Sequence, residues 1–212
     1  GEGYGLYKNA VQEESLEAKV AEIRSQENFT SLEDLPETYV QAVVSVEDHR
    51  FYDHFGLDLI AIGRAVVNDI KAGRYVEGGS TITQQLAKNL YFSQEKTMNR
   101  KAAEVFLALE LEQKYTKDEI LELYVNSIYF GDGYYSVGEA SEGYFGKPAS
   151  EMNDYECTLL AGVPNAPSKY APSKNLALAE KRQQKVISRM EACGYITEEE
   201  TTLMAAQLVA LN

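Results

Sequence analysis

Apolar residues recur at spacings of three and four along almost the whole chain of 212 residues. That spacing places them on one face of an α-helix and is typical of amphipathic helices that bury one side. The alternation of apolar and polar residues that marks a half-buried strand is nearly absent. The pattern predicts an all-α fold, with helices within residues 16–26, 36–48, 57–73, 79–92, 97–115, 117–130, 150–163, 176–193 and 197–210.

Local signals mark where several of these helices begin and end. Ser or Thr followed three residues later by Glu or a related side chain is typical of a helix start. Such pairs are Thr116 with Glu119, Ser150 with Asn153, and Thr197 with Glu200. Glycine or proline marks the ends, at Gly131, Gly146 and Pro164. No repeat or Ser/Gly linker divides the chain, so we expect residues 1–212 to form one domain.

The composition agrees with a globular domain, since 44% hydrophobic content in 212 residues can form a sizeable core. Cys157 and Cys193 lack the paired spacing of a metal site, so we expect two ordinary thiols; a disulfide between them is left open. No run approaches the ~20 apolar residues of a membrane-spanning helix. The chain opens with GEGYGLYKN, which is no signal segment, so we expect a form without an anchor.

The net charge of −13 disfavours nonspecific binding to nucleic acid or to an anionic bilayer. Acidic runs such as Glu198–Glu200 are most simply solvated surface. The cations are distributed unevenly, and four of them fall within one short stretch, at Lys88, Lys96, Arg100 and Lys101. Because the net negative charge of the whole molecule would repel nucleic acid, we expect no nucleic-acid partner.

Three blocks combine carboxylates, amides and cations with small residues at intervals that helix packing alone does not need. They are SVEDHRFYDHFGLD (45–58), EGGSTITQQLAKNL (77–90) and EKTMNRKAAE (95–104). Glu47 follows the apolar run VQAVVSV, and burial raises the pKa of a carboxyl group toward the range of a general base. Ser80 or Thr81 can cap a helix whose first amides attract anions. Together the blocks predict a polar cleft.

These blocks, with TKDEILELYVNSIYFGDGYYSVGEASEGYFGK (116–147) and KRQQKVISRM (181–190), resemble a known family. It is the family 51 glycosyltransferase domain of class A penicillin-binding proteins and monofunctional peptidoglycan glycosyltransferases. The resemblance covers roughly residues 36–192, in family order. It implies a lysozyme-like, two-lobed all-α domain with a hydrophobic jaw that faces the membrane. It also implies an upstream anchor and a location on the extracytoplasmic face of the bacterial cell membrane.

The resemblance implies that the chain polymerises lipid II into β-1,4 glycan strands, with inversion and with loss of undecaprenyl pyrophosphate. Glu47 then deprotonates the acceptor 4-hydroxyl, and Glu104 orients cations or a divalent ion around the pyrophosphate. The sequence itself requires no cofactor, while Mg²⁺ or Mn²⁺ is compatible with such a substrate. Lipid II and the growing glycan chain are the expected partners, and a transpeptidase domain or partner stays open.

Substrate-binding residues also follow from the resemblance. Asp48, Phe51 and His54 are expected to shape the surroundings of Glu47. Lys88, Lys96 and Arg100 are expected to hold the phosphates. The other expected lining residues are Arg64, Ser80, Thr81, Gln84, Gln85, Ser93 and Tyr129. On a helix, Thr81, Gln84 and Lys88 share a stripe that we expect to face the cleft, although a capped amphipathic helix would show the same stripe.

Three other features have simpler explanations. His49 and His54, five residues apart, do not share a helical face, which disfavours a metal pair. Residues 93–96 spell SxxK, the acylation motif of transpeptidases, but no KTG follows, so we expect no labelling by penicillin. Arg100 and Glu104 are spaced for an ion pair worth only ~0.3–0.5 kcal/mol if exposed.

The segment 57–70 is apolar around much of its circumference. A fully buried helix is the usual explanation for such a segment. The resemblance makes interfacial docking against a bilayer an equal alternative.

Two other classes of function stay open. A lysozyme-like hydrolase shares a helical cleft and a catalytic glutamate, but it needs a general acid for a neutral leaving group. Cations beside the glutamates favour synthesis, because pyrophosphate leaves without such help. An inactive cell-wall-binding module is the non-enzymatic alternative.

Overall fold

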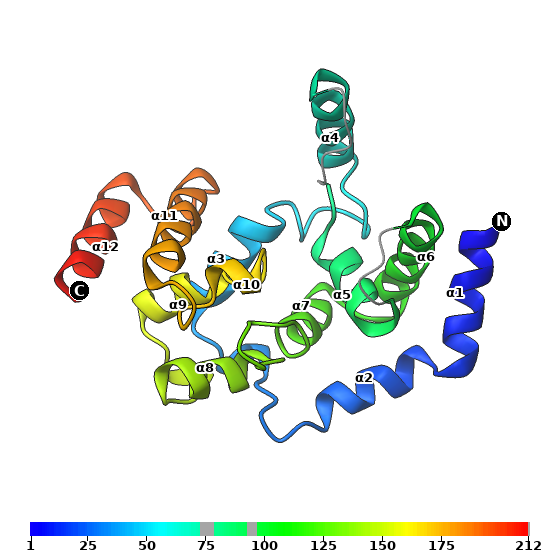
Figure 1. The fold of residues 1–212 in the computed structure, drawn as a ribbon, viewed down its shortest axis with the longest axis horizontal. Helices are drawn as coiled ribbons and strands as arrows, with labels where there is room; N and C mark the ends of the chain where they lie inside the picture. Colours follow the sequence, from blue (N-terminus) through cyan, green and yellow to red (C-terminus); the bar gives the residue numbers. More distant parts are fainter. Residues whose placement is uncertain (73–78, 93–96, 212) are drawn as a thin grey trace. The chain divides into compact units, whose positions relative to one another are not determined.

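The structure, a computed structural model, describes residues 1–72, 79–92 and 97–211, and the chain is helical and free of strands within them (Figure 1). The all-α prediction is confirmed. The chain divides into two compact units, each made of two separate segments. Unit 1 combines Gly1–Ser25 with Arg50–Tyr124, and unit 2 combines Gln26–His49 with Val125–Asn212.

Unit 1 is built around one long helix, α6. Its helices are α1 (Glu2–Glu13), α2 (Leu16–Arg24), α4 (Leu59–Ala72), α5 (Ile82–Tyr91), α6 (Met98–Lys114) and α7 (Lys117–Val125). Both α1 and α5 pack against α6 (Figure 1). Leu107 and Leu111 of α6 and Leu86 of α5 are fully buried, so the core of this unit lies between these two helices.

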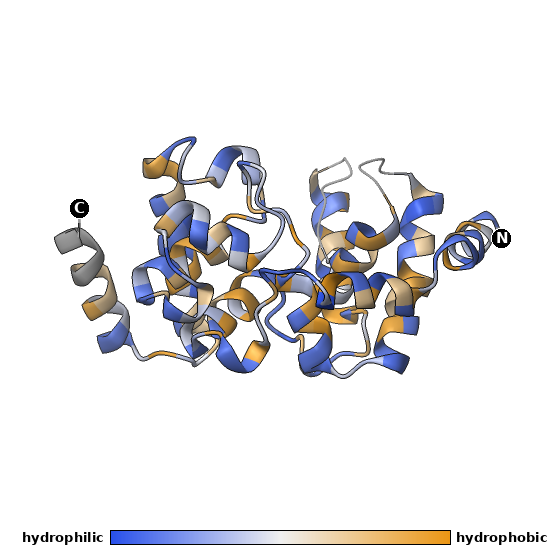
Figure 2. Cartoon of the chain, turned by 90° about the horizontal axis from the view of Figure 1, so that it is seen from below, coloured by the Kyte–Doolittle hydropathy of each residue, from blue (hydrophilic) through white to orange (hydrophobic). Residues whose placement is uncertain are grey.

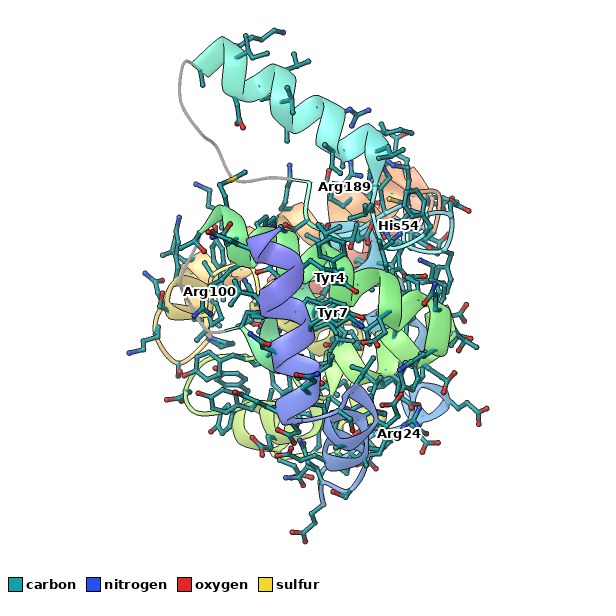
Figure 3. All side chains as sticks on the ribbon, turned by 90° about the vertical axis from the view of Figure 1, so that its right-hand side faces the viewer. Tyr4, Tyr7, Arg24, His54, Arg100 and Arg189 are labelled. Atoms are coloured by element: carbon teal, nitrogen blue, oxygen red, sulfur yellow. The ribbon has the colours of Figure 1, made fainter. Side chains whose placement is uncertain are left out.

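The helix α1 lies outside the ranges that the sequence pattern predicts, because glycines at 1, 3 and 5 disfavour a helix. Gly3 has a packing reason, since a Cβ at this position would lie 2.5 Å from the Cβ of Ala102 on α6. Beside this close approach, Tyr4 and Tyr7, labelled in Figure 3, pack their rings on Phe106 at centroid distances of 5.2 and 5.9 Å. Aromatic packing and a close backbone approach thus hold α1 on α6.

Unit 2 holds the remaining elements, which are η1 (Leu32–Asp34), α3 (Glu37–Glu47), α8 (Val137–Phe145), η2 (Ala149–Glu151), α9 (Asp154–Ala161), α10 (Pro167–Tyr170), α11 (Leu176–Ala192) and α12 (Glu198–Leu211). The helices α3, α9 and α11 pack against one another. Their fully buried residues include Tyr39, Leu160 and Val186, one from each helix. Figure 2 shows apolar and polar residues interleaved along the helices of the chain, as the spacing predicts.

Both thiols lie in unit 2 and are free. Cys157 is buried in α9, and burial raises the pKa of its thiol to about 12, with the charges of Asp154 and Glu156 adding to the effect. Cys193 is half-buried. The expectation of two ordinary thiols is confirmed, and the disulfide that the sequence left open is absent between these residues.

Two of the predicted helix starts are confirmed. Glu119 N–H donates to Thr116 Oγ1, and Thr116 N–H donates to a Glu119 carboxylate oxygen. The same reciprocal pair joins Thr197 and Glu200. Gly146 ends α8 in the left-handed region at φ 67°, as a helix-terminating glycine does.

The predicted start at Ser150 is wrong. Residues Ala149–Glu151 form the short η2, and α9 begins three residues later with Asn153 as its cap. Asn153 Oδ1 accepts from Glu156 N–H, and Glu156 Oε1 accepts from Asn153 N–H, both at 2.9 Å. Asn153 is the stronger helix cap because Glu156 completes its capping box. Ser150 has only the amide side chain of Asn153 three residues later.

Candidate active site

Glu47 and Asp48 lie at the end of α3 in unit 2. The apolar residues before them, including Ala42, Val43 and Val44, are buried where α3 packs on α9 and α11. Glu47 is half-buried and its Oε1 atom is enclosed by protein, while Asp48 is buried. The core packing of α3 therefore places a partly desolvated carboxylate at the helix end, as the sequence predicts.

Tyr39 lies in the core on the same helix and stays a neutral phenol. Burial raises the pKa of its hydroxyl well above the usual value, and the neighbouring Cys157 and Glu47 add to the rise. A phenol that keeps its proton adds no second negative charge near Glu47.

The rest of the first motif belongs to unit 1 and forms a tight loop. Phe51 is fully buried, and the His54 ring stands edge-on to it at a centroid distance of 5.9 Å. Gly56 has φ +102°, which favours glycine, and its N–H donates to His54 Nδ1 at 3.0 Å. Its carbonyl accepts from Thr81 Oγ1 at 2.8 Å. The loop is thereby tied to the start of α5.

The second motif supplies the cap of α5. Thr81 Oγ1 accepts from Gln84 N–H, and Gln84 Oε1 accepts from Thr81 N–H, both at 3.0 Å. Both side chains are buried, at 1% and 3% exposure. This differs from the expected polar stripe facing a cleft, because these oxygens are used to close the helix end. Lys88, by contrast, is exposed on the last turn of α5.

The third motif supplies a carboxylate and a cation, which meet a hydroxyl of the second motif in unit 1. Glu104 is buried at 6% exposure on α6, where Leu107 and Ala108 are also buried. Lys101 Nζ lies 3.6 Å from Glu104 Oε2 and donates to Ser80 Oγ at 2.6 Å. Lys101 is not among the substrate-binding residues expected from the sequence, although its position three residues before Glu104 on a helix is the signal that could have identified it.

Other predicted residues are placed as follows. Arg100 lies in the first turn of α6, where its N–H is capped by Thr97 Oγ1, and it is labelled in Figure 3. Arg64 is exposed on α4. Gln85 Oε1 accepts from the hydroxyl of Tyr124 at 3.1 Å, which joins α5 to α7.

Tyr129 belongs to unit 2 and is 39% exposed. Its ring packs on that of Tyr135 at a centroid distance of 4.6 Å, and its hydroxyl accepts from Gly133 N–H. Ser93 and Lys96, with the SxxK segment they belong to, lie outside the described residues.

The helix α4 differs from every other helix of unit 1, because none of its residues is buried. Its exposed apolar side chains are Leu59, Ile60, Ile62, Val66, Val67 and Ile70. Figure 1 shows α4 standing apart from α5 and α6, and Figure 3 shows its side chains pointing outward on several sides. The alternative of a fully buried helix is therefore wrong. None of the helices in the described parts of the chain is long and apolar enough to span a membrane.

Within residues 1–72, 79–92 and 97–211, no three His, Cys, Asp or Glu residues gather as a metal site requires. Glu104 is the carboxylate of the third motif that would hold a divalent cation, since Mg²⁺ is commonly held by one or two carboxylates plus phosphate oxygens.

The comparison with protein families decides what these motifs belong to. The family model described as Transglycosylase matches residues 13–191. The chain belongs to this family, the glycosyltransferases of family 51. It is a peptidoglycan glycosyltransferase domain. Every described motif residue discussed above falls within the matched range.

Relatives of this family are similar over most of the chain. Penicillin-binding protein 1A of Aquifex aeolicus (strain VF5) is 46% identical over 81% of this chain and 24% of its own length. Penicillin-binding protein 1A of Escherichia coli (strain K12) is 45% identical, over 86% and 21%. The chain thus spans about a quarter of the length of these relatives. A crystal structure of Penicillin-Binding Protein 1A from Haemophilus influenzae matches 82% of this chain and 16% of that one, at 24% identity and TM-score 0.47.

Proposed function

We propose that this domain polymerises lipid II into β-1,4 glycan strands and releases undecaprenyl pyrophosphate. The observation that carries the proposal is the group of Glu104, Lys101 and Ser80, where a buried carboxylate and an ammonium group meet a hydroxyl. A cation held in place beside the leaving group stabilises the charge that develops on a departing pyrophosphate. Membership of the transglycosylase family supports the same chemistry.

The proposed step is one displacement. The acceptor 4-hydroxyl oxygen attacks C1 of the donor sugar, its proton passes to Glu47, and the bond from C1 to the pyrophosphate oxygen breaks. Because the donor is α-linked and the new bond is β, one inversion suffices and no covalent sugar intermediate forms. Partial enclosure of Glu47 suits it as the base, since desolvation makes a carboxylate more basic.

The pyrophosphate is proposed to be held by cations of the second and third motifs. Lys88 and Arg100 join Lys101 in this role, and Lys96 is assigned to it from the sequence alone. Glu104 keeps Lys101 in place and would hold Mg²⁺ or Mn²⁺ against the phosphates if such an ion binds. A bound ion would supply further positive charge to the leaving group.

Contact with the bilayer is proposed to run through α4. Six exposed apolar side chains on one helix form a surface that water solvates poorly, and a lipid-linked substrate must be reached at a membrane. The working location is then the extracytoplasmic face of the bacterial cell membrane. A transpeptidase domain or partner would use the glycan product.

Incubation of the purified protein with lipid II and with finished glycan tests the function. Glycan polymer from lipid II, with no shortening of added glycan, is the expected result. Shortened glycan would instead identify a hydrolase. Binding of lipid II without any product would identify an inactive wall-binding module.

A further inference from the structure

Two tyrosines of unit 2 are packed on each other at the surface, on either side of a tight turn. The ring centroids of Tyr129 and Tyr135 lie 4.6 Å apart, at an interplanar angle of 33°. Tyr129 is 39% exposed and Tyr135 is 58% exposed. A single exposed aromatic side chain needs no explanation, but two packed rings form an apolar surface that carries hydroxyl groups. Tyr135 has no role in the chemistry above.

The turn between the two rings has an unusual backbone conformation. Gly131, Asp132 and Gly133 have φ values of 81°, 55° and 83°, all in the left-handed region. Glycine adopts this region freely, but Asp132 does so at an energetic cost. A residue held in this way persists where its surroundings fix it, and such residues cluster at ligand sites. The turn therefore brings the two rings together at a cost to stability.

Contacts on the inner side of the turn hold it in place. A Cβ on Gly131 would lie 2.8 Å from the Cβ of Ala171, so the turn backbone packs closely on this neighbour. Phe130 N–H donates to the carbonyl of Tyr134, and the hydroxyl of Tyr144 donates to the carbonyl of Phe130 at 2.7 Å. The Tyr134 ring stands edge-on to that of Tyr144 at a centroid distance of 5.0 Å. These two inner tyrosines anchor the turn that carries the outer pair.

Each residue of the outer pair also has a hydrogen bond of its own. Gly133 N–H donates to the hydroxyl oxygen of Tyr129 at 3.1 Å, which fixes that ring across the turn. Tyr135 N–H donates to Glu139 Oε2 at 2.9 Å, which fixes the backbone from which the other ring extends. Side chains that are already held in place lose less conformational entropy when a ligand binds. The pair is thus preorganised for binding.

The charges around the pair indicate which ligand it suits. The only charged residues between positions 129 and 139 are two acids, the exposed Asp132 and the half-buried Glu139. Negative charge disfavours phosphate groups and anionic lipid. A sugar ring of a β-1,4-linked chain has apolar C–H faces that pack on aromatic rings, and hydroxyl groups that donate to carboxylates and phenol oxygens. The surroundings therefore favour a sugar ring over a phosphate or a lipid headgroup.

We propose that Tyr129 and Tyr135 form a sugar-binding platform for the glycan strand, with the Tyr135 ring as the stacking surface. The inference rests on the proposed function, since it names the part of the substrate that this surface of unit 2 binds. A strand held on the platform dissociates more slowly between additions. Because the number of additions in one encounter is the ratio of the addition rate to the dissociation rate, the platform favours long strands.

Binding of a β-1,4-linked N-acetylglucosamine tetramer tests the platform without catalysis. The chain has 15 tyrosines, so Tyr129→Phe and Tyr135→Phe variants are used to assign the two ring signals by NMR. We expect both signals to move as the tetramer is added. Tyr135→Ala should weaken tetramer binding about 3- to 10-fold, because the stacking surface is lost, whereas Tyr135→Phe should stay within about twofold of wild type.

The matched control is Tyr195→Ala, which removes a 38% exposed tyrosine elsewhere in unit 2 and should bind the tetramer as wild type does. Circular dichroism should show that all variants are folded. Ring signals that stay unmoved in the wild type, or equal weakening by Tyr135→Ala and Tyr195→Ala, would overturn the proposal. Movement of the Tyr135 signal with vesicles of anionic lipid but not with the tetramer would also overturn it, and would assign the pair to a membrane surface.

The length of glycan made from lipid II tests the functional link. Tyr135→Ala should shorten the strands about 3- to 10-fold, in proportion to the weaker binding, and length should fall more than the initial rate of lipid II consumption. Tyr135→Phe should restore the length. Unchanged length in a variant with weakened tetramer binding would contradict the role in holding the strand. If the wild type makes no polymer, the proposed function fails, and the tetramer titration still decides whether the pair binds sugar.

Discussion

The helices α4 and α6 belong to one unit, but they differ in which side chains they bury and which they expose. On α6 a carboxylate, Glu104, is buried among Ala103, Leu107 and Ala108. On α4 no residue is buried, and Ile70 is 75% exposed. Charged groups normally stay in water and large apolar patches normally leave it. Each helix departs from that rule in its own direction, which agrees with the chemistry proposed for α6 and the lipid contact proposed for α4.

The largest expected effect comes from removing the buried carboxylate of α6. Glu104→Gln should lower kcat/KM on lipid II about 100–1,000-fold, because the cation beside the leaving group loses the carboxylate that holds it. Glu110→Gln is the matched control on the same helix, where the carboxylate pairs with Lys114 at 3.3 Å. Circular dichroism should show both variants folded. Equal activity of the two variants would remove Glu104 from the account.

The second effect comes from removing an exposed apolar side chain of α4. Ile70→Ser should weaken binding to vesicles of bacterial lipids about 10- to 150-fold, since burying one large apolar side chain contributes roughly 1.5–3 kcal/mol. Met98→Ser is the control, because Met98 is 83% exposed at the other helix. If the Met98 variant lost binding, or if the Ile70 variant bound vesicles as well as wild type, lipid contact would lie elsewhere.

A third prediction concerns what keeps α6 covered. Gly3→Ala should lower the free energy of unfolding by about 1–3 kcal/mol, because the added methyl meets Ala102 of α6. Gly5→Ala, where nothing lies within 4 Å, should raise it by up to about 1 kcal/mol through helix propensity. Urea unfolding of both variants provides the measurement. If the two substitutions have the same sign, α1 does not pack on α6 as described.

The smallest effect concerns the carboxyl group of Asp58, directly before α4. Burial alone would raise the pKa of Asp58, but hydrogen bonds from Ala61 N–H and the ion pair with Arg50 hold it below its usual value. A carboxyl with a lowered folded-state pKa contributes stability that is present above about pH 4 and is lost as the pH falls further. Asp58→Asn should therefore have a lower free energy of unfolding than wild type at pH 6. The difference should shrink as the pH falls toward 3. A constant difference would show that the charge of Asp58 contributes nothing.

Local patterns could be predicted from the sequence, and contacts between distant segments could not. The capping pairs at Thr116 and Thr197 depend on residues three apart, so the sequence contains all that decides them.

Contacts that join separate elements were missed for a physical reason. Lys101 meets Ser80 across 21 positions, and Lys117 meets His54 across 63. Helical spacing cannot show such pairs, because only tertiary packing brings the segments together. The exposure of α4 was undecidable for a related reason, since an all-round apolar helix suits either a core or a lipid surface.

The central claim is that Glu47 is the base that activates the acceptor hydroxyl. Its most direct test is the rate of glycan polymer formation from lipid II by Glu47→Gln beside wild type, with helical content checked by circular dichroism. The account predicts a folded variant whose rate falls about 100- to 10,000-fold, the usual contribution of a general base. A folded Glu47→Gln protein that polymerises lipid II at the wild-type rate would contradict it.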